Sequence, residues 1–148
     1  MIKKRIYLLP VIILFCLFYY ACGSSSDTTS KYLKKGTYDF ILMDSLSIPL
    51  VEGVAEIDTS GSDVFGSYQI VKVADSTFKG YGSIQRGGEF KGHYDRTTGE
   101  VSMNMNPRVA DANIFVSAKI YGTILRGTWS YSTFRGNTSG GNFKATRE

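Results

Sequence analysis

The chain contains very few residues that carry acid–base, thiol or metal chemistry. It has one histidine and two cysteines in 148 residues. The histidine, His93, stands among charged residues on the polar side of an alternating segment, which predicts a solvated surface side chain. The chain contains no Gly-x-Ser-x-Gly nucleophile elbow, and zinc sites built from histidine and cysteine lack their ligands. The sequence therefore predicts no catalytic residue, no cofactor and no metal site, and we expect a protein that is not an enzyme.

Carboxylates leave one enzymatic alternative open. Two-carboxylate hydrolysis needs a pair of acidic side chains that face a common substrate. Four carboxylates could meet across neighbouring strands: Asp39, Glu52, Glu56 and Asp58. Three of these four alternate along one segment, as the outward face of a strand does, so a hydrolase of unknown type ranks third among the functions considered. The loop over residues 106–113 does not have the ligand spacing of a calcium loop.

Clustered basic charge is also missing. The formal net charge is +4, with 17 basic and 13 acidic residues. Lys3, Lys4 and Arg5 precede the hydrophobic run, and removing these three from 17 leaves 14 basic residues against 13 acidic ones. A protein that follows a phosphate backbone gathers lysine and arginine on one surface. We therefore expect no nucleic-acid partner.

The single long hydrophobic run stands at the start of the chain. Lys3, Lys4 and Arg5 are followed by apolar residues from Ile6 to Tyr20 and then by small and polar residues. This is the layout of a secretory signal. The run is interrupted by Pro10 and is shorter than the roughly 20 residues that a transmembrane helix needs. We expect residues 1–21 to be a signal peptide, with a retained membrane anchor as the alternative. Both place the remaining chain outside the cytoplasm.

The sequence Ala21-Cys22-Gly23-Ser24 resembles the lipobox of bacterial lipoproteins, in which the cysteine is lipidated and becomes the new N-terminus. Cysteine usage agrees with this, because Cys16 lies in the part removed and no cysteine follows Cys22. The resemblance implies acyl chains on Cys22 that hold the protein on a membrane of the cell envelope, each methylene contributing about 0.8 kcal/mol. That membrane is the outer membrane if the source is Gram-negative. Residues 22–30 are rich in serine and threonine, which predicts a flexible tether.

From Lys31 onward the chain has the composition of an all-β domain. All 16 glycines follow the hydrophobic run, and β-branched and aromatic residues alternate with polar ones. In the clearest segment, Val101, Met103 and Met105 alternate with polar residues, as in a strand with one face in water. Residues 31–148 are therefore predicted to form one β domain. The predicted strands cover residues 38–42, 51–58, 64–73, 77–85, 89–95, 100–106, 112–120, 124–131 and 141–146.

The connections favour an antiparallel meander. Thr59-Ser60-Gly61, Arg96-Thr97-Thr98-Gly99 and Tyr121-Gly122 are short and supply glycine where hairpins need a positive φ. No segment has a sustained helical period, so parallel crossovers are not expected. Eight or nine short strands must close or stack to hide their edges. We predict a small up-and-down barrel, closed or nearly closed, with a two-sheet β-sandwich as the alternative.

A glycine that follows a basic residue and precedes an aromatic recurs in three segments. They are Phe78-Lys79-Gly80-Tyr81, Phe90-Lys91-Gly92-His93-Tyr94 and Leu125-Arg126-Gly127-Thr128-Trp129. The favoured interpretation is structural, because glycine lets a strand bend sharply and lets a neighbouring aromatic lie over it. The alternative is a row of bases and aromatics that grips a sugar or an anion.

Gly127-Thr128-Trp129 resembles the Gly-x-Trp element of lipocalin-like barrels, which are ligand carriers in which the tryptophan closes one end of the barrel. This resemblance implies that Trp129 is a barrel-end plug. Large aromatic side chains also dominate the cores of small domains, so burial of Trp129 is expected on either ground.

Two functions outside enzymology follow from a small exported barrel. In the first, the barrel holds a small hydrophobic ligand, since about eight strands are just wide enough for one. Its lining would come from Phe40, Phe90, Tyr94, Met103 and Trp129. In the second, side chains fill the interior and the protein is a structural or assembly element of the envelope. The expected partners are the membrane, through Cys22, and the ligand of the first alternative; the sequence identifies no protein partner.

Overall fold

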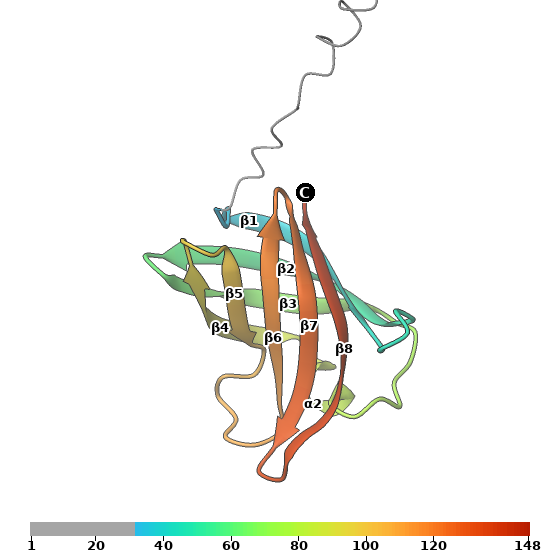
Figure 1. Ribbon diagram of the computed structural model, residues 1–148. Coiled ribbons are helices and arrows are strands. Elements are labelled where there is room, and N and C mark those ends of the chain that lie inside the picture. Colours follow the sequence, from blue (N-terminus) through green and yellow to red (C-terminus); the bar gives the residue numbers. More distant parts are fainter. Residues whose placement is uncertain (1–31) are drawn as a thin grey trace, which may run out of the picture.

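Eight antiparallel strands close into a barrel in the computed structural model, which describes residues 32–148 (Figure 1). Each strand pairs with the next along the chain, and the last pairs with the first. The strands are β1 (Gly36–Met43), β2 (Pro49–Ser60), β3 (Asp63–Val73), β4 (Gly88–Asp95), β5 (Glu100–Asn104), β6 (Asn113–Tyr121), β7 (Ile124–Thr133) and β8 (Gly136–Arg147). The predicted closed up-and-down barrel is confirmed, and the alternative of two stacked sheets is wrong.

Inward and outward side chains alternate along the strands as the sequence predicted. Tyr38, Phe40 and Leu42 of β1 are buried. In β5, Val101 and Met103 are buried, and the residues between and beside them face outward. Successive side chains of a strand point to opposite faces, so one face of each strand lines the interior and the other meets solvent. Eight of the nine predicted strands correspond to β1 to β8.

The ninth predicted strand, over residues 77–85, is wrong. That stretch belongs to the connection from β3 to β4 and contains a helical turn, α2 (Tyr81–Ile84). Turn chemistry takes the backbone out of the sheet here, because the Thr77 amide donates to Asp75 Oδ1 at 2.7 Å and Gly80 adopts a φ of 104°. Ile84 is fully buried. The apolar residues that suggested a strand face therefore pack against the barrel core from outside the sheet.

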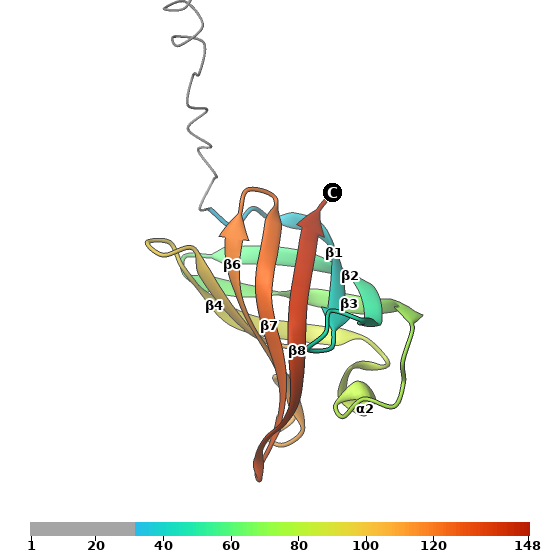
Figure 2. The same cartoon turned by 45° about the vertical axis from the view of Figure 1, so that its right-hand side comes forward.

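The two ends of the barrel differ in what they carry. Figures 1 and 2 show the start of the described chain at the same end as the C-terminus and the β6–β7 hairpin. The opposite end carries α2, the β5–β6 connection and the β7–β8 hairpin. The predicted signal peptide (1–21), the tether (22–30) and Cys22 lie outside the described residues. Over residues 32–148, the structure contains no helix that is long and apolar enough to cross a bilayer.

Candidate functional site

The residues predicted to line a ligand cavity all point into the barrel. Their exposed fractions are 7% or less. Phe40 meets Tyr68 edge-on, with ring centroids 6.1 Å apart. The five residues come from strands β1, β4, β5 and β7: Phe40, Phe90, Tyr94, Met103 and Trp129. Their function therefore depends on how much free volume they enclose.

The cavity among these side chains is very small. Phe40, Phe90 and Met103 line a space of about 20 Å³, together with five further apolar residues. A cavity that holds one water needs roughly 10–15 Å³, whereas ligand sites measure about 300–1,000 Å³. Because its lining offers no polar partner, even a water molecule would be poorly held. The further lining residues are Ala55, Ile57, Met105, Phe143 and Ala145.

Aromatic rings occupy the space that the inward glycines leave. Phe40 lies in register with Gly53 of the neighbouring strand, and a Cβ on Gly53 would come within 2.6 Å of the Phe40 ring. Phe90 lies in register with Gly66, where the corresponding distance is 2.7 Å. Aromatic rings laid over cross-strand glycines are a device of strongly curved sheets. Gly53 and Gly66 therefore make room for neighbouring rings, whereas a Cβ at Gly92 or Gly127 of the recurring segments would meet the backbone of the adjacent strand.

The connection between β3 and β4 packs against the indole of Trp129. Phe78 contacts the indole edge-on, with ring centroids 5.4 Å apart, and also contacts Tyr81 at 5.9 Å. Trp129 Nε1 donates a hydrogen bond to the Met43 carbonyl oxygen at 2.7 Å. Trp129 is 2% exposed. The indole is thus held by a hydrogen bond and covered by the connection, and its expected burial is confirmed.

Two buried tyrosines reach backbone carbonyls. The Tyr68 hydroxyl donates to the Met105 carbonyl oxygen at 3.0 Å, and burial raises the pKa of Tyr68 to about 12. The Tyr38 hydroxyl donates to the Lys34 carbonyl oxygen at 2.7 Å. Burial also raises the pKa of Tyr38, although Arg147 and the bond to Lys34 act in the opposite direction. Both phenols therefore stay protonated at neutral pH and act as structural donors.

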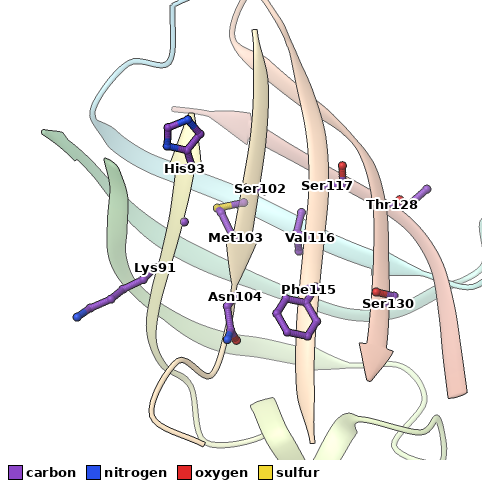
Figure 3. A pocket seen from close by; sticks show the side chains of 11 residues that line it. Lys91, His93, Ser102, Met103, Asn104, Phe115, Val116, Ser117, Thr128 and Ser130 are labelled. Atoms are coloured by element: carbon purple, nitrogen blue, oxygen red, sulfur yellow. The ribbon is translucent and has the colours of Figure 1, made fainter. Parts of the chain in front are cut away.

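The outer face of the barrel carries larger hollows than the interior. One of about 400 Å³ lies over β4 to β7 (Figure 3). Lys91 and His93 project from β4 at one side of it, and the Phe115 ring lies beside Asn104. Hydroxyl side chains occupy the remaining outward positions: Ser102, Ser117, Thr128 and Ser130. His93 is exposed, as predicted. Sequence reasoning missed this hollow, because its residues lie far apart in the chain.

A second hollow adjoins the first. It has a volume of about 560 Å³ and lies over β1 to β4. Phe65 and Ser67 of β3 belong to its lining, and Lys91 lines both hollows. Three acidic side chains line it: Asp58 forms an ion pair with Lys35, Glu89 pairs with Arg108 at 2.6 Å, and Glu56 accepts a hydrogen bond from the Thr37 hydroxyl.

The carboxylates considered for hydrolysis lie on the outer face of β1 and β2. Glu52 forms an ion pair with Lys72 at 2.7 Å, and Glu56 accepts a hydrogen bond from the Thr37 hydroxyl at 2.8 Å. Asp39 and Glu52 border one open hollow of about 420 Å³. The Glu52 side chain is partly exposed, and Lys72 matches its charge. The arrangement at Glu52 is therefore that of a surface ion pair.

Comparison with known proteins adds no functional assignment. No protein family, no curated protein and no solved structure matches the chain. Within residues 32–148, histidine, cysteine and carboxylate side chains form no group of three that could hold a metal ion.

Proposed function

We propose that this chain is an exported, lipid-anchored protein of the cell envelope whose filled barrel acts through its outer face. The observation that carries the proposal is the interior cavity of about 20 Å³, which is more than tenfold smaller than a ligand site of about 300 Å³. The carrier alternative would require the packed rings of Phe40 and Phe90 to move apart. Moving them would expose apolar surface that the fold buries, at about 25 cal/mol per Å².

The anchor part of the proposal depends on Cys22. A lipidated cysteine followed by a flexible tether would place the barrel near the membrane with its N-terminal end nearest to it. Cells grown with labelled palmitate should label the protein, and Cys22→Ser should abolish the label. Cys16→Ser is the matched control, because Cys16 lies within the signal and should not affect labelling. Equal labelling of the Cys22→Ser variant would remove the anchor from the proposal.

The filled barrel is tested by titration with apolar compounds. The chain has one tryptophan, so Trp129 emission reports on the interior of the full-length protein. Fatty acids, retinoids and small aromatics should produce no saturable change in that emission. Met103→Ala, which enlarges the cavity, should gain binding of benzene, because engineered apolar cavities stay dry and accept such ligands. A saturable change with the unaltered protein would support the carrier function instead.

A further inference from the structure

The hollow over β4 to β7 and the hollow over β1 to β4 meet along one row of in-register residues. Phe65 pairs with Lys91, Lys91 with Asn104, and Asn104 with Phe115. The two phenylalanines are 39% and 42% exposed, respectively. Three strand spacings of about 4.8 Å separate them, or about 14 Å along the sheet. The outer face thus presents two apolar rings with a cation and an amide between them.

Unused hydrogen-bonding groups surround Phe115. Among residues 32–148, the hydroxyls of Ser102, Ser117, Thr128 and Ser130 form no side-chain hydrogen bond. The Asn104 Oδ1 accepts from the Asn106 amide at 2.9 Å, which leaves the Asn104 amide nitrogen to donate elsewhere. Each hydroxyl can both donate and accept. In this hollow, an apolar ring is therefore surrounded by hydroxyl groups that can each donate and accept a hydrogen bond.

This combination matches the chemistry of a sugar ring. A sugar presents hydroxyls that donate and accept, and it presents carbon–hydrogen faces that can lie on an aromatic ring. A protein partner fits less well, because serine is depleted at protein interfaces and these interfaces need a larger apolar centre. Two exposed rings about 14 Å apart suit an extended chain of sugars better than a single one.

Within the described chain, a cation without an ion pair, Lys91, lies at the junction of the hollows. Of the three carboxylates that line the second hollow, Asp58 and Glu89 are paired with Lys35 and Arg108, and Glu56 accepts a hydrogen bond from the Thr37 hydroxyl. The hollow of Figure 3 is lined by Lys91 and His93 and by no carboxylate. Asp63 is the cross-strand neighbour of His93 and lies outside that lining. The free positive charge is therefore at Lys91, where it would attract an anionic group.

We propose that the two hollows bind a polysaccharide chain that carries carboxylates. Phe65 and Phe115 stack against sugar rings, and Lys91 pairs with a carboxylate between them. The hydroxyls and Asn104 exchange hydrogen bonds with the sugar. The inference rests on the proposed function in one respect, which is that the protein acts through the outer face of its barrel. Binding itself needs neither the acyl anchor nor an interior cavity.

The test is affinity electrophoresis of the full-length protein in non-ionic detergent. Gels contain polygalacturonate as the acidic probe or dextran as the neutral one. Polygalacturonate should retard the protein and dextran should not. Phe115→Ser should weaken binding by about tenfold, which is the upper range for one aromatic contact, and Lys91→Gln should abolish the preference for the acidic probe. Phe134→Ser and Lys79→Gln are the matched controls, because both residues are exposed and lie outside the hollows.

Each other result would overturn the inference. If polygalacturonate does not retard the protein, the hollows do not bind an acidic polysaccharide. If dextran retards it equally, the binding does not depend on the carboxylates of the polysaccharide. A loss with Lys91→Gln but not with Phe115→Ser or Phe65→Ser shows a plain contact with a polyanion, and losses with the two control variants show that the hollows are not the site. The palmitate label and the Trp129 titration are measured separately on the same variants. Failure of the proposed function can therefore be distinguished from failure of polysaccharide binding.

Discussion

Alanine at Gly127 should strongly destabilise the barrel. Gly127 of β7 lies in register with Ala118 of β6. A Cβ at Gly127 would lie 1.9 Å from the Ser117 carbonyl oxygen and 2.5 Å from the Ala118 Cα. Both atoms belong to the backbone, so no side-chain rotation can relieve the overlap. The two strands must separate by about 1.5 Å to bring the closest approach to the 3.4 Å of an ordinary contact.

A separation of this size breaks hydrogen bonds of the β6–β7 ladder. A bond near 2.9 Å that lengthens by about 1.5 Å no longer counts as one. Each ladder bond contributes about 1 kcal/mol net, and a buried group left without a partner costs about 1–3 kcal/mol. With one or two bonds lost, we expect the free energy of unfolding to fall by about 3 kcal/mol. The same loss corresponds to a fall in Tm of roughly 10 °C for a domain of this size.

Urea unfolding followed by Trp129 emission measures this change. Gly82→Ala is the matched control, because a Cβ there would meet no atom within 4 Å and Gly82 lies within α2. Alanine is preferred to glycine in helices by about 0.5–1 kcal/mol, so the control should be neutral or slightly stabilising. If Gly127→Ala unfolds at the same urea concentration as the unaltered protein, the close approach of β6 and β7 is refuted.

Two further predictions concern the pH dependence and the cooperativity of unfolding. Because the pKa of Tyr68 is raised from 10.0 to about 12, its contribution to stability is fully present below pH 10 and is lost as the pH rises toward 12. Urea titrations between pH 8 and pH 12 should show this loss of stability in the unaltered protein and a smaller loss in Tyr68→Phe. Equal losses in the two proteins would contradict the assignment of the pH dependence to Tyr68. A chain beginning at residue 31 should have a circular dichroism spectrum dominated by strand and should unfold in one cooperative transition. Substantial helix, or a gradual transition without a cooperative midpoint, would count against a single packed barrel.

Most of the fold could be predicted from the local alternation of apolar and polar residues. Along β1 and β5 the environment changes with every residue, so Phe40 and Met103 could be placed inside, and Asn104 outside, without knowledge of their neighbours. The same reasoning failed over residues 77–85. Phe78, Gly80, Gly82 and Ile84 stand at alternate positions and imitate a strand face. Phe78 instead packs on Trp129, a partner about 50 residues away that local sequence does not reveal.

The free volume of the barrel interior could not be predicted from the sequence, because it also depends on residues that are distant in the chain. The inward positions include both large rings and glycines, which fits a ligand cavity and fits tight packing equally well. Cross-strand register decides between them, because it sets Phe40 against Gly53 and Phe90 against Gly66. Each ring then fills the space that its partner glycine leaves. Had the register of β1 shifted by two residues, the alternation would be unchanged but Phe40 would no longer lie opposite Gly53.

Register also creates the outer row. Phe65 and Phe115 are 50 positions apart and belong to strands that do not pair with each other, so neither alternation nor any short motif connects them. The pairs Phe65–Lys91, Lys91–Asn104 and Asn104–Phe115 bring them into one line. A one-residue slip in any of these pairings would turn one member of the row into the core. The buried faces of β3 to β6 oppose such a slip, since it would carry Val64, Phe90 and Val116 into water. The packing that fills the interior is therefore also what fixes the proposed polysaccharide surface on the outside.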